Sequence, residues 1–173
     1  MDMIEALRGR LGDKSSYLDY GYFGVLGADF DENGIATGEY TEKPSYYALA
    51  TLCTLLGGQA KADCMPLKIK PQPSKRVAGN DCSDPTLRFY QFLLDDGSRA
   101  ICYWNGTDIL TRTYEGTVSF EVYGEKTDSI RLVDLRDGTL YRLPEDMTVK
   151  LGVNGVMFKN LPITDVPMAV WFR

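Results

Sequence analysis

The sequence predicts a mainly β protein, an antiparallel β-sandwich of about eight strands with an N-terminal strand–helix appendage. Three observations support this fold class. Apolar segments of strand length recur roughly every ten residues from Leu87 to the C-terminus, with no helical pattern between them. Asp-Gly and Asn-Gly pairs, which favour tight hairpin turns, separate several of these segments. Eleven tyrosines and seven phenylalanines add residue types that are common in strands.

The C-terminal half alternates between apolar and polar side chains, as expected of strands with one buried face. Val118, Phe120 and Val122 give the clearest example, each followed by a less apolar residue. The Asp-Asp-Gly-Ser sequence at 95–98 predicts a hairpin between the first two strands. The expected strands are 87–94, 99–105, 118–123, 129–135, 139–143, 148–151, 156–161 and 168–172.

One helix is predicted over residues 44–56. Tyr46, Leu49, Cys53 and Leu56 recur at three- and four-residue steps, which places them on one face of a helix. Pro44 suits the first turn, where its missing N–H would have no partner. The two glycines that follow the last apolar residue favour a helix end there.

The remaining segments complete the predicted domain organisation. We expect a short helix over 1–11 and, over 18–26, a strand that is buried on both faces. Leu67-Lys-Ile-Lys70 alternates apolar and charged residues, as an edge strand protected by lysine would. The predicted parts are a strand–helix appendage at 1–58, a linker or edge strand at 59–85 and the sandwich at 86–173.

Composition and charge exclude several classes of function. Of the 173 residues, 44% are hydrophobic and 25% are charged, which is ordinary for a folded domain. The net charge of −5 argues against nucleic-acid or anionic-membrane binding, and no apolar run is long enough to span a membrane. The absence of histidine excludes serine–histidine and cysteine–histidine catalysis within one chain, and zinc sites built on histidine. We expect no cofactor.

The residues Asp29 to Gly34, DFDENG, begin like a calcium-binding loop. The twelfth position of such a loop needs a bidentate glutamate, and Tyr40 stands there. We therefore expect a solvated turn and no metal site.

Four cysteines are present, and none belongs to a CxxC pair. Free, buried thiols are the expected state of Cys53, Cys64, Cys82 and Cys102. A bridge between Cys64 and Cys82 is the alternative, because both lie in the polar segment before the sandwich.

The first third of the chain resembles a known family. YFGVL at 22–26 is followed by an acidic loop and then by GEYTEKPSYYALATLCTLL at 38–56. This order of strand, loop and helix is similar to the last β/α unit of a (β/α)8-barrel glycoside hydrolase, in which such a helix often leads into a β-sandwich. LPITDVPMAVW at 161–171 is similar to the last strands of those sandwich domains.

The resemblance implies that catalysis depends on residues outside this chain. Retaining glycosidases use two carboxylates about 5 Å apart. The family's barrels carry them on strands four and seven, and both would precede Met1. A whole barrel takes about 250 residues, so one β/α unit cannot form it. We therefore predict no catalytic residue and an inactive isolated chain. The acidic residues that match neither family position, and for which we expect structural roles, are Glu39, Glu42, Glu115 and Glu121.

Carbohydrate is the candidate ligand, since sugars stack on exposed aromatic rings. Tyr103 and Trp104 are the candidate substrate-binding residues, because Trp104 precedes Asn105-Gly-Thr107 at a strand end where a ring could stay exposed. Trp171 is expected to pack in the core as part of the last strand.

The predicted function is that of a non-catalytic C-terminal sandwich that supports a glycoside hydrolase barrel. A carbohydrate-binding module, which a flat row of exposed aromatic rings would mark, and an assembly domain are the alternatives. The helix over 44–56 has apolar residues on more than one side, so we also expect a homo-oligomer formed through residues 1–58. The cellular location of the protein stays unknown. The sequence after Met1 does not have the pattern of a signal peptide, and the parent enzyme could be exported only with a signal that is not in this sequence.

Overall fold

The computed structural model describes residues 25–33, 35–58, 60–72, 87–106, 116–124, 129–163 and 166–173. The described part is mainly β, as predicted, with antiparallel sheets and one α-helix, α3 (Pro44–Leu55). The chain divides into two compact units, Met1–Ala50 and Thr51–Arg173. The helix predicted at 1–11 and most of the strand predicted at 18–26 lie outside the described residues.

In the first unit, the described strands form a hairpin rather than the predicted strand and loop. β1 (Leu26–Phe30) pairs antiparallel with β2 (Ala36–Glu42). The turn between them is fixed by Asp31, whose Oδ1 accepts the backbone N–H groups of Asn33 at 2.9 Å and Ile35 at 2.8 Å. The calcium-like sequence therefore closes a hairpin, and its aspartate bonds to the backbone as turn aspartates do.

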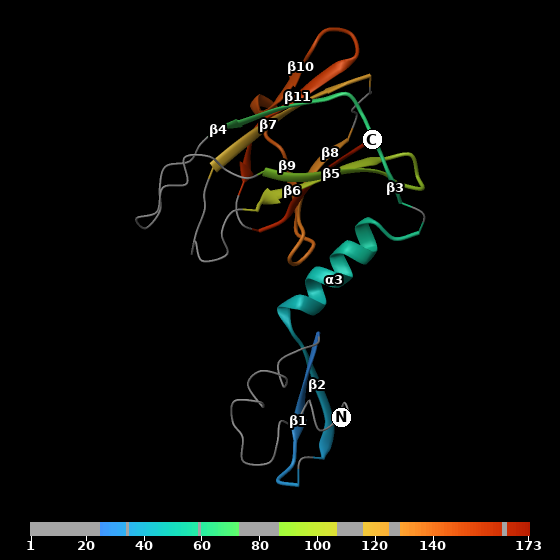
Figure 1. Cartoon of the computed structure of the whole chain (residues 1–173), viewed down its shortest axis with the longest axis vertical. Coiled ribbons are helices and arrows are strands. Elements are labelled where there is room, and N and C mark those ends of the chain that lie inside the picture. The colour runs from blue at the N-terminus through green and yellow to red at the C-terminus, as the bar shows by residue number, and fades with distance from the viewer. Residues whose placement is uncertain are drawn as a thin grey trace. The chain divides into compact units, whose positions relative to one another are not determined.

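The second unit contains two antiparallel sheets, which Figure 1 shows as two layers. The four-stranded sheet has the order β10 (Thr148–Lys150), β11 (Gly155–Ile163), β7 (Gly116–Tyr123) and β4 (Leu67–Gln72). A short 3-10 helix, η1 (Glu145–Met147), precedes β10. The six-stranded sheet has the order β3 (Lys61–Ala62), β5 (Leu87–Leu93), β6 (Arg99–Asn105), β12 (Met168–Phe172), β8 (Ile130–Asp134) and β9 (Leu140–Arg142).

The predicted strands of the C-terminal half are all present, with ends that differ by two residues at most. Helix α3 also begins at the predicted residue and ends one residue early. Within 59–85, β3 and β4 are edge strands of the two sheets, so the described part of this segment belongs to the sandwich. The boundary between compact units lies inside α3, between Ala50 and Thr51, whereas the sequence suggested residue 58.

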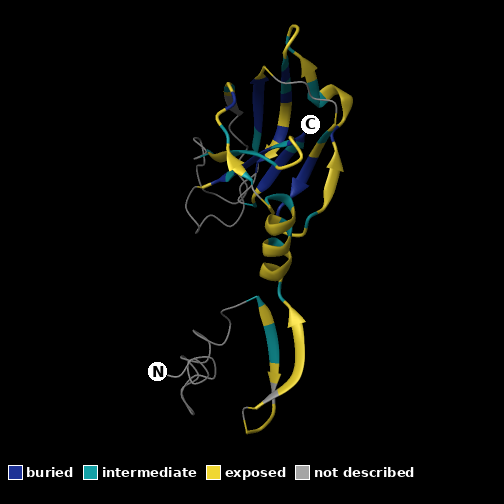
Figure 2. Cartoon of the chain, turned by 90° about the vertical axis from the view of Figure 1, so that its right-hand side faces the viewer, coloured by how far each residue is buried: buried dark blue, intermediate teal, exposed yellow. Residues whose placement is uncertain are grey.

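The core lies between the inner faces of the two sheets, where Figure 2 shows the buried strands in dark blue. A bulge in β11 keeps both ends of the strand in register with β7: Asn160 has φ 54°, and its N–H donates to Ser119 Oγ at 3.1 Å. The largest fully buried side chains are Tyr103, Phe120, Phe158, Phe172, Ile101, Leu161 and Ile163.

A second apolar cluster lies on the outer face of the six-stranded sheet. Its buried members are Cys102, Val133, Leu135 and Ala169, and Leu55 of α3 packs on them together with Phe92 and Trp171. The helix ends at Leu55, and Gly58 follows in the turn with a φ of 80°, in the left-handed region that favours glycine. The last turn of α3 is therefore part of the sandwich unit.

The cysteines match the expectation of free, buried thiols only in part. Cys64 is free but exposed, and its alternative bridge involves Cys82, a residue outside the described part of the chain. Cys102 is a free, buried thiol as expected, and burial raises its pKa to about 11. Cys53 is also free but exposed.

Candidate functional site

Tyr103, a predicted sugar-binding residue, lies in the core. Its ring is fully buried and packs edge-on against Phe120, with 5.2 Å between the ring centroids. Its hydroxyl donates to the carbonyl oxygen of Pro162 at 2.9 Å. Burial raises the pKa of the phenol, so it stays neutral. Because solvent does not reach the ring, Tyr103 cannot stack on a sugar, and this prediction is wrong.

Trp104, the second predicted sugar-binding residue, is half-buried on the opposite face of β6. Its indole stacks on the ring of Tyr90 from β5, with centroids 5.7 Å apart and planes 22° apart. Tyr90 is 58% exposed. Since each ring covers a face of the other, the pair does not offer the flat row of open ring faces expected of a carbohydrate-binding module.

Trp171 lies in the last strand as predicted, but it is half-buried on the outer face of its sheet rather than in the core between the sheets. Its ring lies against the second apolar cluster, and its indole N–H donates to Ser98 Oγ at 2.9 Å. Ser98 is fully buried in the turn before β6, so this bond gives a partner to a buried hydroxyl. The role of Trp171 is therefore structural.

The four glutamates considered above do not form a catalytic pair in the described part of the chain. Glu39 and Glu42 are exposed on β2, and Glu115 lies outside the described residues. Glu121 is buried on the outer face of β7, where its Oε2 accepts the Tyr123 hydroxyl at 2.7 Å. This bond raises the pKa of Tyr123.

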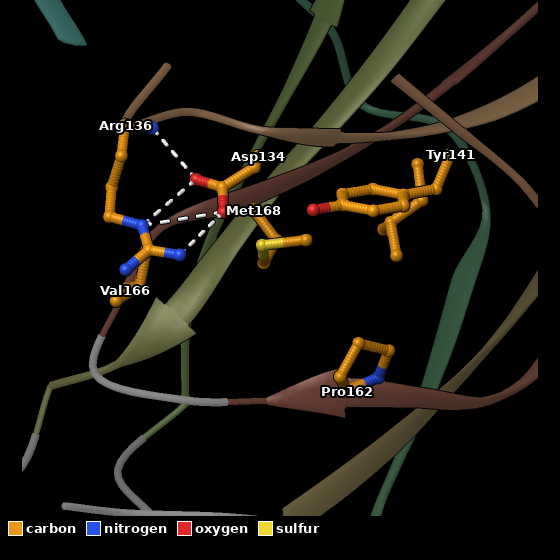
Figure 3. Close-up of a pocket in the computed structure, with 7 residues that line it drawn as sticks. Asp134, Arg136, Tyr141, Pro162, Val166 and Met168 are labelled. Carbon is orange, nitrogen blue, oxygen red and sulfur yellow. Dashed lines mark hydrogen bonds and ion pairs between the residues drawn. The ribbon is translucent and has the colours of Figure 1, made fainter. Parts of the chain in front are cut away.

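The structure also contains a hollow that the sequence did not indicate, between the ends of β8, β9, β11 and β12. Its volume is about 290 Å³. The side chains around it are mostly apolar, with one ion pair at the rim (Figure 3). The lining residues are Leu132, Asp134, Arg136, Tyr141, Pro162, Val166 and Met168.

The ion pair at the rim joins Asp134, the last residue of β8, to Arg136 in the following turn. Arg136 Nη2 lies 2.8 Å from Asp134 Oδ2, and Arg136 Nε lies 3.2 Å from Oδ1. Asp134 is 4% exposed. The guanidinium bonds hold the pKa of Asp134 below its ordinary value of 3.8, and the carboxylate raises the pKa of Arg136.

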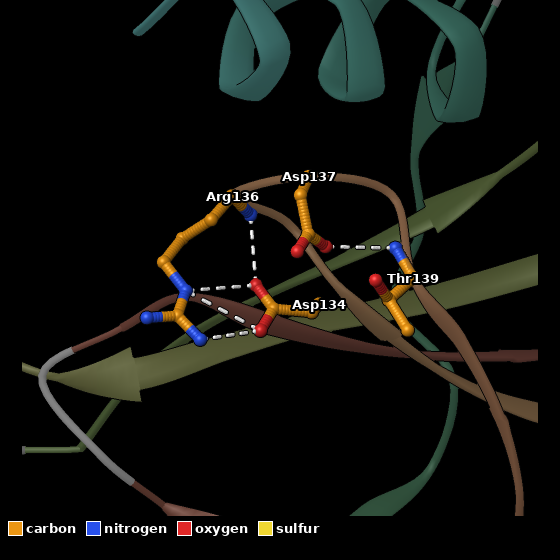
Figure 4. A network of polar contacts seen from close by, with 4 residues as sticks. All are labelled: Asp134, Arg136, Asp137 and Thr139. Carbon is orange, nitrogen blue, oxygen red and sulfur yellow. Dashed lines mark hydrogen bonds and ion pairs between the residues drawn. The ribbon is translucent and has the colours of Figure 1, made fainter. Parts of the chain in front are cut away.

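The turn between β8 and β9 holds Arg136 in this position. Asp134 Oδ1 also accepts the backbone N–H of Arg136 at 2.9 Å, and Asp137 Oδ1 accepts that of Thr139 at 2.9 Å (Figure 4). Gly138 has φ 77°, a conformation that favours glycine, and its N–H donates to the Asp134 carbonyl. The Arg-Asp-Gly-Thr sequence, predicted as a turn, thus also places the ion pair at the mouth of the hollow.

The described residues contain no group of three side chains suited to hold a metal ion. Within the same residues, no helix is long and apolar enough to cross a membrane. No protein-family model matches the chain, and no curated protein matches it at a significant level. The resemblance to glycoside hydrolases therefore rests on the sequence segments quoted above.

Replacing Arg136 by Gln tests the ion pair. Because the folded-state pKa of Asp134 is lowered, its stabilising effect is present above the ordinary carboxyl pKa and is lost as the pH falls through the lowered value. We expect Arg136→Gln to decrease the urea midpoint at pH 7, with a difference from the wild type that shrinks in acid. Arg142→Gln is the control, since Arg142 forms no ion pair within the described residues. Equal shifts for both variants at every pH would contradict this.

Proposed function

We propose that this chain is the C-terminal region of a (β/α)8-barrel glycoside hydrolase, and that its β-sandwich supports the barrel without taking part in the chemistry. The barrel itself would come from sequence other than these residues. The resemblance of residues 22–56 and 161–171 suggests the family, and the structure contributes one observation in favour of a supporting role.

That observation is the unequal burial of helix α3. Leu55 packs on the outer-face cluster of the sandwich, whereas no residue of the helix is fully buried. Tyr46, Leu49 and Leu52 are 39%, 50% and 38% exposed. A helix that carries apolar side chains on its free side has a second surface to bury. In the family, the helix of the last β/α unit meets the barrel on such a side.

Self-association is the second candidate, and the exposure of other apolar residues in the first 58 positions favours it. Leu26, Ile35 and Tyr40 are 46%, 59% and 61% exposed. A two-fold dimer would cover the same apolar surface on both chains at once. Solution mass distinguishes this from a surface reserved for a barrel.

The supporting role predicts that the isolated chain does not hydrolyse aryl-glycosides above background, because the four glutamates considered above form no catalytic pair among the residues that the structure describes. The assay needs repurified protein, so that a contaminating glycosidase is removed. Turnover that persists after repurification and disappears in Glu121→Gln or Glu42→Gln would contradict the proposal.

The apolar side of α3 predicts concentration-dependent association through residues 1–58. We expect the mass from light scattering to exceed that of a monomer and to rise with concentration. Leu49→Glu combined with Leu52→Glu should restore a monomer with little change in melting temperature, since both side chains are exposed. Leu140→Glu, at a 64% exposed leucine on β9, is the matched control and should leave the mass unchanged. A constant monomer mass for the wild type would exclude self-association and leave the surface of α3 to a barrel.

A further inference from the structure

We propose that the hollow lined by Tyr141, Pro162 and Met168 binds a neutral sugar ring. This goes beyond the supporting role of the sandwich, because it requires no barrel. The argument rests on the size of the hollow, its apolar walls and the hydrogen-bonding groups at its rim.

The size and walls suit one small ring. A volume of about 290 Å³ is near the lower limit of small-molecule pockets. Figure 3 shows the Tyr141 ring and the Pro162 ring on opposite sides of the hollow, with Met168 between Tyr141 and Asp134. Tyr141 is 47% exposed, so its ring is open to a ligand. Two ring surfaces that face a common space can hold the C–H face of a pyranose by dispersion contacts.

The rim supplies hydrogen-bonding groups that suit hydroxyls. Arg136 uses Nε and Nη2 for Asp134, and within the described residues its Nη1 makes no hydrogen bond. The Tyr141 hydroxyl is likewise without a partner in that part of the chain, and it points into the hollow (Figure 3). A guanidinium N–H only donates, whereas a phenol hydroxyl can donate and accept. Adjacent sugar hydroxyls, which also do both, match this combination.

The charge at the rim favours a neutral ligand. Asp134 neutralises Arg136 through their ion pair, and Asp137 adds a negative charge in the same turn. An anionic sugar would therefore gain little from Arg136. A wholly apolar ligand could use the ring faces but would form no hydrogen bond with Arg136 Nη1 or with the Tyr141 hydroxyl, so it would make fewer contacts than a sugar.

Titration of the full chain, followed by amide NMR, tests the site. The probes are methyl β-glucopyranoside and methyl β-xylopyranoside, with sodium glucuronate and indole as charged and apolar comparators. We expect at least one neutral glycoside to give saturable shifts centred on Leu132, Tyr141 and Met168, and to bind more tightly than either comparator. Tyr141→Ala should weaken this binding by about tenfold or more, and Tyr141→Phe by less, because it keeps the ring.

Trp104→Ala is the matched control, since it removes the aromatic ring on the other face of the sheet. It should leave the affinity unchanged. Circular dichroism checks that each variant is folded, and Tyr141→Phe carries the test if Tyr141→Ala does not fold. Three results would each overturn the proposal: no saturable shift with the neutral probes, tighter binding of glucuronate or indole, or loss of binding in Trp104→Ala. None of them affects the supporting role, which depends on Leu55 and its cluster.

Discussion

The six-stranded sheet carries apolar side chains on both of its faces, so each face needs other parts of the sandwich unit to cover it. Along β6, Ile101 and Tyr103 face the core, whereas Cys102 faces outward and is buried as well. One face is covered by the four-stranded sheet. The other needs a separate cover, because an apolar patch left in water costs free energy in proportion to its area. The last turn of α3 supplies that cover through Leu55.

This packing connects the fold to the proposed function. Leu55, in the last turn of α3, packs on the sandwich, whereas other apolar side chains of the helix stay exposed. A supporting role requires no catalytic group, and the described glutamates are exposed or bonded to a tyrosine. The hollow beside β9 uses other residues, so support and ligand binding do not compete for the same surface.

Local sequence signals were sufficient to predict where the strands of the sandwich begin and end. Period-two alternation and Asp-Gly turns act over a few residues, and the strand ends they predict are accurate within two residues. The orientation of the faces was harder to predict. Tyr103 and Trp104 are neighbours, so they lie on opposite faces, but the sequence does not say which face meets the other sheet. The sugar-binding prediction for Tyr103 failed for that reason.

Local sequence signals could not predict the hollow. Tyr141, Pro162 and Met168 come from β9, β11 and β12 and meet only through long-range pairing of strands. The hairpin of β1 and β2 was missed for a different reason. The resemblance favoured a loop after residue 26 and a helix entry from Thr41, whereas Gly27 and Ala28 in fact pair with Thr41 and Tyr40.

The most direct test of this account compares two leucines of the same helix by urea unfolding. Leu55→Ala removes the side chain that packs on the outer-face cluster, whereas Leu49→Ala makes the same substitution at a leucine of the same helix that is 50% exposed. We predict that Leu55→Ala lowers the free energy of unfolding by about 1–3 kcal/mol, less than for a fully buried leucine, and that Leu49→Ala changes it by at most about 0.5 kcal/mol. Equal effects of the two substitutions would contradict the claim that Leu55 packs on the outer-face cluster of the sandwich.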